Sequence, residues 1–128
     1  MEAREALLRI KDVIEHYGDE KVKHSFYLEF NRRLLVLRLI EEYNRKGGVI
    51  IDLGAQPFIV SCALKLMGYE VIAYDYNPGP YQSLAEMFGV KVHKCDLERD
   101  SLGIVDESVD CAVLSEVIEH LSHHYLDE

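Results

Sequence analysis

Four polar sites in this 128-residue sequence lie where short apolar runs end, and side chains in such places can bind a ligand. They are Asp52, Asp75, Asp96 and the pair Ser115-Glu116. An ionised carboxylate accepts hydrogen bonds from hydroxyl, amino and backbone N–H groups, and it attracts positive charge. If the apolar runs are parallel strands of one sheet, their carboxyl ends meet at one edge, beside the crevice where such sheets bind ligands. This recurrence is the strongest positional signal in the sequence.

The segment after the first run, residues 52–58, reads Asp-Leu-Gly-Ala-Gln-Pro-Phe. A dinucleotide-binding loop carries Gly-x-Gly-x-x-Gly, whose free N–H groups hold a pyrophosphate, but Gly54 is the only glycine here. Pro57 removes one N–H donor, and Asp52 adds a negative charge where a diphosphate would lie. These features favour a ligand without phosphate that carries positive groups, such as the sulfonium and ammonium groups of S-adenosylmethionine. The alternative is structural: Gly54 makes a tight turn, and Asp52 caps the following helix.

The next two acids suit the nucleoside part of such a ligand. Asp75 lies 23 residues after Asp52, where a carboxylate can accept two hydrogen bonds from the 2′ and 3′ hydroxyls of a ribose. Asp96 can accept a hydrogen bond from the amino group of an adenine. The alternatives are a solvated acid that starts the turn at Asn77 for Asp75, and a helix or turn cap for Asp96.

Helical and strand patterns alternate along the chain after Gly48. The pattern predicts helices at 57–67, 81–88 and from 116, and strands at 49–51, 70–74, 90–95 and 109–114. Such alternation indicates right-handed crossovers and a parallel sheet. We therefore expect an α/β fold with four parallel strands and helices on both faces. We expect residues 1–47 to form an N-terminal helical segment and residues 48–128 to form the ligand-binding domain.

The N-terminal segment has the 3.6-residue apolar period of two helices, at about 6–17 and 24–45. The stripe of the second helix comprises Phe26, Phe30, Leu34, Leu37 and Ile40. Because Leu35, Val36 and Leu39 widen this stripe, we expect one long and well-buried helix that ends at Gly47-Gly48.

Residues 49–124, about 60% of the chain, resemble the N-terminal half of the class I methyltransferase family. The resemblance is closest to members with Asp-x-Gly-Ala-x-Pro-Phe as first motif and Glu-Val-Ile-Glu-His-Leu after the fourth strand, which match residues 52–58 and 116–121. It implies a Rossmann-like fold with the strand order 3-2-1-4, S-adenosylmethionine as cofactor, and methyl transfer to an unknown O, N or C acceptor. The sequence departs from the commoner family pattern at Gln56 and Phe58, where that pattern has glycines.

The positions that we expect to bind the cofactor combine these motifs with the strand ends. They are Asp52, Gly54, Ala55, Gln56, Asp75, Tyr76, Asn77, Asp96, Leu97 and Ser115.

Glu116, Glu119 and His120 are spaced so that they share one face of a helix. We expect Glu116 and His120 to lie near the methyl acceptor as the catalytic residues. The trio resembles the metal site of small-RNA 2′-O-methyltransferases, in which a cation would activate the acceptor hydroxyl. We favour no metal here, because acids in a first helical turn are stabilised by the helix dipole and three side chains leave the coordination of an ion incomplete.

Charge and composition narrow the partners. The net charge is −9, and residues 49–128 hold four Lys and Arg against fourteen Asp and Glu. An acidic surface repels phosphate backbones, so a nucleic-acid partner is not expected for this chain alone. No run of about 18 apolar residues predicts a membrane span. The three cysteines form no Cys-x-x-Cys pair and suit thiols in a reducing cytoplasm.

The family's sheet has seven strands, and this sequence ends soon after the fourth. Because residues 109–114 are apolar enough for a covered strand, we expect either a truncated chain or a homodimer through the exposed edge of that strand. An alternative function is therefore a catalytically incomplete module that binds S-adenosylmethionine or S-adenosylhomocysteine. A further alternative is a nucleotide-binding or interaction domain unrelated to methyl transfer.

Overall fold

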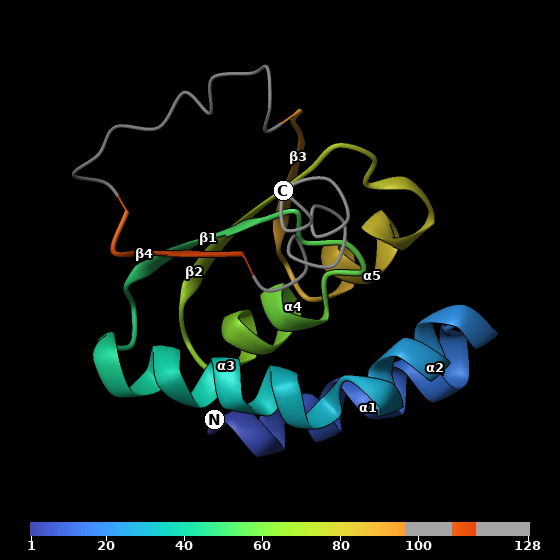
Figure 1. Cartoon of the computed structure of the whole chain (residues 1–128), viewed down its shortest axis with the longest axis horizontal. Helices are drawn as coiled ribbons and strands as arrows, with labels where there is room; N and C mark the ends of the chain where they lie inside the picture. Colours follow the sequence, from blue (N-terminus) through green and yellow to red (C-terminus); the bar gives the residue numbers. More distant parts are fainter. Residues whose placement is uncertain (97–108, 115–128) are drawn as a thin grey trace, which may run out of the picture.

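A four-stranded parallel sheet lies at the centre of the protein, in a computed structural model that describes residues 1–96 and 109–114 (Figure 1). The strand order is β3-β2-β1-β4, which confirms the predicted order 3-2-1-4. The strands are β1 (Val49–Leu53), β2 (Glu70–Asp75), β3 (Lys91–Lys94) and β4 (Cys111–Val113). The run Val-Ile-Ile begins β1, and its β-branched side chains suit a strand that is packed on both faces.

Side chains of β1 alternate between the two faces of the sheet. Ile50 lies beside Val71 of β2, and both belong to the large core cluster that includes buried residues of the helices. Ile51, one residue later, belongs to a second cluster with Tyr74 and Cys95. The second cluster contains no residue of a described helix, and the helix predicted from residue 116 lies outside the described residues.

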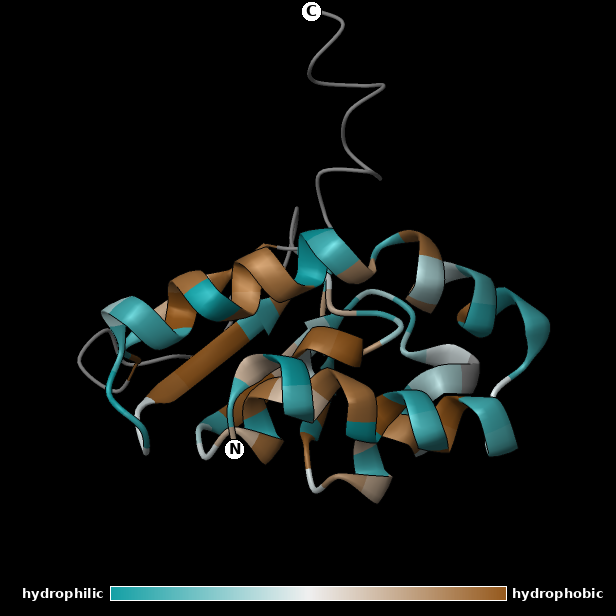
Figure 2. Cartoon of the chain, turned by 90° about the horizontal axis from the view of Figure 1, so that it is seen from below, coloured by the Kyte–Doolittle hydropathy of each residue, from teal (hydrophilic) through white to brown (hydrophobic). Residues whose placement is uncertain are grey.

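The described helices all lie on the side of the sheet to which Ile50 points. They are α1 (Ala3–Tyr17), α2 (Glu20–Leu28), α3 (Phe30–Tyr43), α4 (Ile59–Leu66) and α5 (Gln82–Met87), and a short 3-10 turn, η1 (Gly79–Tyr81), precedes α5. Among them, α4 and α5 contact the strands. Figure 1 shows α4 between the sheet and the N-terminal helices. In Figure 2, brown apolar and teal polar segments alternate along the helical ribbons, as expected for helices with one buried face.

The expectation of one helix over 24–45 is wrong, because the segment forms two helices. The side chain of Asp19 accepts a hydrogen bond from the N–H of Val22 at 2.8 Å, and this cap starts α2 four residues earlier than predicted. At Glu29 the backbone (φ −103°, ψ 10°) leaves the helical conformation, and α3 begins at the next residue.

The burial of α3 also differs from the prediction. Leu34, Leu37 and Ile40 are buried, but Leu35 and Leu39 are 59% and 47% exposed. A straight helix presents only one stripe to a flat layer, and residues 35 and 39 share the opposite face. The additional apolar residues of α3 therefore do not indicate that the helix is buried on all sides.

Arg33 joins α2 to α3 across the break. Its side chain is 1% exposed, and its guanidinium donates to the carbonyl oxygen of Ser25 at 3.1 Å and to the Ser25 hydroxyl at 2.9 Å. A buried cation has lost its water, so these hydrogen bonds stabilise the folded state only while both partners are present.

We expect Arg33→Met to lower the free energy of unfolding by about 2 kcal/mol, because it removes hydrogen bonds of a buried charged group and leaves the half-buried Ser25 without them. Urea denaturation followed by circular dichroism measures the change. Arg32→Met is the control, since Arg32 pairs with Glu29 in a partly exposed ion pair, and pairs in contact with water contribute about 1 kcal/mol or less. Equal losses for the two variants would contradict the role given to Arg33.

The N-terminal helices and the sheet share one core. Buried residues of α1, α2 and α3 belong to the same cluster as those of α4 and β2. The domain boundary predicted at 47/48 stays a prediction. None of the helices in the described ranges has the length and apolar character needed to cross a membrane.

Candidate functional site

The loop after β1 turns its backbone N–H groups toward the end of β2. Gly54, with φ 66°, donates its N–H to the carbonyl oxygen of Tyr74 at 2.8 Å, and Ala55 donates to the same oxygen at 3.2 Å. The N–H of Gln56 donates to Oδ2 of Asp75 at 2.9 Å. Three successive N–H groups are therefore bound within the protein, and they are not presented to a phosphate in this arrangement.

The entry to α4 is tighter than predicted. The N–H of Phe58 donates to the carbonyl oxygen of Ala55 at 2.6 Å, and the Gln56–Pro57 peptide bond inside this turn is cis. Phe58 has φ 73°, and α4 begins at Ile59. The expectation that Pro57 forms part of the first helical turn is wrong, because the left-handed backbone of Phe58 separates the proline from the helix.

Asp52 is fully buried on the helix side of β1. Its Oδ2 accepts a hydrogen bond of 2.7 Å from the hydroxyl of Ser61, which lies in the first turn of α4. The positive end of the helix dipole stabilises a carboxylate at this place. Burial raises the pKa of the Cys62 thiol, and the nearby charge of Asp52 raises it further.

This position differs from the interpretation of Asp52 as a charge at the tip of the ligand loop. The side chain of Asp52 shares the face of Ile50, so its carboxylate lies beneath α4. Cofactor binding by Asp52 stays a prediction. The contact with Ser61 connects the end of β1 to α4, and that connection supports the loop between them.

Asp75 lies at the centre of a closed set of hydrogen bonds. Its Oδ2 accepts from the N–H of Gln56 at 2.9 Å, and its Oδ1 accepts from the N–H of Asn77 at 3.0 Å. The side-chain amide of Gln56 donates to the carbonyl oxygen of Asn77 at 3.1 Å. The half-buried carboxylate therefore joins the ends of β1 and β2, and the exposed ring of Tyr76 lies next to it in the chain.

The end of β3 lies beside the end of β2. The N–H of Cys95 donates to the carbonyl oxygen of Asp75 at 2.8 Å, and the half-buried Asp96 follows. The structure thus brings Asp75 and Asp96 to neighbouring strand ends, as the parallel sheet requires. Two other predicted cofactor residues, Leu97 and Ser115, lie outside the described residues.

The predicted catalytic and metal-binding residues Glu116, Glu119 and His120 also lie outside the described residues. Within residues 1–96 and 109–114, no three His, Cys, Asp or Glu side chains are grouped so that they could hold a metal ion.

Two contacts at this edge could not be predicted from the sequence. The ring of Tyr74 stacks on His93 with 5.4 Å between centroids, a pair that only the register of β2 against β3 brings together. The amide of Gln56 crosses to Asn77 of the next loop. Both contacts depend on which strands are neighbours, so residue spacing within one segment could not reveal them.

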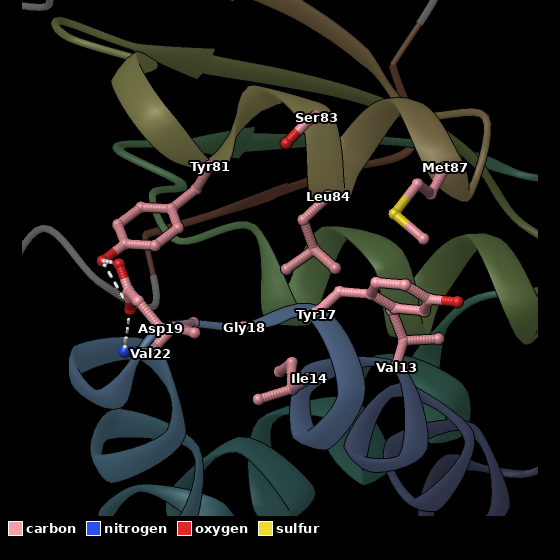
Figure 3. A pocket seen from close by; sticks show the side chains of 10 residues that line it. All are labelled: Val13, Ile14, Tyr17, Gly18, Asp19, Val22, Tyr81, Ser83, Leu84 and Met87. Atoms are coloured by element: carbon pink, nitrogen blue, oxygen red, sulfur yellow. Dashed lines mark hydrogen bonds between the residues drawn. The ribbon is translucent and has the colours of Figure 1, made fainter.

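A hollow of about 160 Å³ lies between the α1–α2 turn and the η1–α5 segment, as Figure 3 shows. The hydroxyl of Tyr81 donates to the carboxylate of Asp19 across its mouth, at 3.1 Å to Oδ2. Burial raises the pKa of Tyr81, and the hydrogen bond to Asp19 raises it further. The segment 77–81 is thus tied to the first loop on one side and to the N-terminal helices on the other.

The wall residues of the hollow come from both of these segments. They are Val13, Ile14, Tyr17, Gly18, Asp19, Val22, Tyr81, Ser83, Leu84 and Met87.

The chain resembles known proteins both in sequence and in structure. A family model described as a methyltransferase domain matches residues 51–128. Among solved structures, the chain is similar to 1,6-didemethyltoxoflavin-N1-methyltransferase of Burkholderia thailandensis, crystallised with 1,6-didemethyltoxoflavin and S-adenosylhomocysteine. The identity is 22% and the TM-score 0.48, over 77% of this chain and 44% of that protein, so this chain spans less than half of its length. No curated protein matches the chain.

Proposed function

Because the chain belongs to the methyltransferase domain family, whose model matches residues 51–128, we propose that it binds S-adenosylmethionine at the carboxyl edge of its sheet. We further propose that the methyl group of this cofactor passes to an O, N or C atom of an unknown acceptor. The site consists of the loop after β1 and the acids at the ends of β2 and β3.

One observation favours S-adenosylmethionine over a dinucleotide as the ligand. The N–H groups of Gly54, Ala55 and Gln56 are all bound to the end of β2, and the residue that follows is a proline without an N–H. A dinucleotide needs such groups free for its phosphates. A nucleoside without phosphates does not, and it needs acceptors for its ribose hydroxyls and its adenine amino group, which carboxylates supply.

Each described residue of the site has a proposed role in binding this ligand. Each oxygen of Asp75 accepts one backbone N–H and has a further lone pair, so the carboxylate retains the acceptors that a ribose diol needs. Asp96 binds the adenine amino group from the next strand end. Gly54 and Ala55 let the ligand approach the backbone, and Tyr76 borders the nucleoside.

The remaining predicted residues act from further away or complete the site. Asp52 positions the loop through Ser61 and α4. Leu97 and Ser115 complete the cofactor contacts.

When bound, S-adenosylmethionine supplies a methyl group on a positively charged sulfur, which makes that methyl reactive toward nucleophiles. The work of the protein is then to hold donor and acceptor in line and to keep water away from them. The acids at the strand ends also favour the positive charge of the donor. Glu116 and His120 are our candidates on the acceptor side.

A catalytically incomplete binding module is the second candidate function. The amide of Gln56 lies across the gap between two strand ends, bonded to Asn77, where the commoner family pattern has a glycine. This bridge favours a site that holds the nucleoside in a restricted way. A methyl-transfer assay on protein that binds the cofactor distinguishes the two functions.

We expect S-adenosylhomocysteine to bind in isothermal titration calorimetry, and NADH at the same concentrations to give no binding heat. The physical reason is the use of the loop N–H groups by β2, which leaves a diphosphate without donors. Adenosine is the control, because it shares the ribose and adenine of both ligands. Binding of NADH without binding of S-adenosylhomocysteine would select a dinucleotide site instead.

We also propose a cytoplasmic location and no nucleic-acid partner for this chain alone. Within the described residues no disulfide joins the cysteines Cys62, Cys95 and Cys111, which suits a reducing compartment. The acidic residues 49–128 disfavour binding to phosphate backbones. A homodimer through the edge of β4, which pairs with β1 along one side, stays a proposal.

A further inference from the structure

The side chain of Gln56 ties two loops together directly beside the carboxylate that is the best candidate for a ribose. Its amide nitrogen donates to the carbonyl oxygen of Asn77, while its own backbone N–H donates to Asp75. The N–H of Asn77 donates to the other oxygen of Asp75. The three residues thus form a closed ring that spans the ends of β1 and β2.

The bridge also lies close against the turn that follows β2. A Cβ atom placed on Gly79 would lie 3.4 Å from the amide nitrogen of Gln56 and 3.4 Å from Oδ1 of Asn77. The amide therefore occupies the space between the first loop and this turn. A ligand that enters between the two loops has to share that space or displace the amide.

We infer that Gln56 sets the affinity of the crevice for the nucleoside by closing it over Asp75, an inference that rests on the proposed function. A ribose diol gains the open lone pairs of Asp75 only after the Gln56 amide has left Asn77. The side chain is half-buried and has no other hydrogen bond among the contacts found in the described ranges, so this single bond holds it in place.

The cost of opening follows from the kind of bond. A neutral hydrogen bond near the surface exchanges with bonds to water, so its net loss changes an equilibrium by a factor of about two to ten. The same factor separates the affinity of the closed crevice from that of an open one. The effect should appear in ligand binding, and because the same bond stabilises the free closed protein, its loss should also make the free protein slightly less stable.

Two substitutions test whether the bond is responsible. Gln56→Ala removes the amide, and Gln56→Met keeps a side chain of similar length without a donor; both keep the backbone N–H that binds Asp75. We expect each variant to bind S-adenosylhomocysteine and adenosine about two- to tenfold more tightly than the natural protein, in calorimetric titrations. The unfolding midpoints of the free variants should be slightly lower than that of the natural protein, because the bond that closes the crevice also stabilises the free fold.

Gln82→Ala is the matched control. The side chain of Gln82 donates to Glu86 on α5, away from the strand ends, so its loss should leave both affinities unchanged.

Each other outcome contradicts a different claim. Tighter binding by Gln56→Ala but not by Gln56→Met would assign the effect to bulk and overturn the bridge. A gain for S-adenosylhomocysteine without one for adenosine would place Gln56 at the methionine end and overturn its position over the ribose. Unchanged or weaker binding by both variants, with clear binding by the natural protein, would overturn this inference alone. No binding by any form would overturn the proposed function and this inference with it.

Discussion

Replacing Asp75 by alanine should weaken the binding of S-adenosylhomocysteine by about 100-fold, because a carboxylate contributes charge-assisted hydrogen bonds that are individually strong. The substitution removes the proposed acceptor of the ribose diol. It also removes the group that holds the N–H of Gln56 and the N–H of Asn77, so the two loops lose their common anchor. Calorimetric titration measures the affinity, and circular dichroism shows whether the fold is retained.

The sheet offers a matched control at its opposite edge. Asp110 also accepts a backbone N–H at one end of β1, since its Oδ2 binds the N–H of Val49 at 2.7 Å. Asp110→Ala therefore removes a similar structural contact away from the proposed site. We expect its affinity for S-adenosylhomocysteine to stay within about a factor of two of that of the natural protein. Equal losses in both variants would show that Asp75 acts through stability alone.

Phe58 should give an unusual order of stabilities, in which glycine is better tolerated than alanine. Its ring is fully buried in the core, so either substitution removes it at a cost of about 3–5 kcal/mol. The backbone, however, lies in the left-handed region at φ 73°, where any residue with a Cβ is strained by about 1–2 kcal/mol relative to glycine. We expect Phe58→Gly to unfold at a higher urea concentration than Phe58→Ala.

Phe58→Leu separates the two effects, because it keeps most of the buried volume and the same backbone strain. Its free energy of unfolding should lie between those of the natural protein and the alanine variant. Ala63→Gly in α4 is the control for the backbone effect. Because glycine is unfavourable within a helix, this variant should be less stable than the natural protein by about 1 kcal/mol. The left-handed conformation of Phe58 would be contradicted if glycine were the less stable residue at both positions.

Most of the fold could be predicted because it follows from local periodicity. The β-branched run at 49–51 and the later apolar runs lie within the observed strands or within three residues of their ends. Their alternation with helices is sufficient to predict parallel pairing, and the strand order was predicted correctly from the resemblance. The single helix expected at 24–45 failed because the apolar period continues through Glu29, where the helix breaks.

The candidate site, like the fold, could be predicted only in part. The strand ends Asp75 and Asp96 could be found by counting along the sequence, since parallel strands must present their carboxyl ends at one edge. The direction of Asp52 could not be found, because a strand buried on both faces carries no pattern that says which face a helix covers. The hydrogen bond from Gln56 to Asn77 joins loops 21 residues apart and exists only once their strands are neighbours.

By itself, the order of residues determined which acids stand at the tips of the strands, because the two-residue period of a strand and the turns between elements are local properties. Only the tertiary structure decided which of those acids joins the ends of β1 and β2, which is buried under a helix and which side chain bridges the two loops. Those outcomes depend on packing between segments that are distant in the sequence, and such packing selects one face of each strand and one path for each loop.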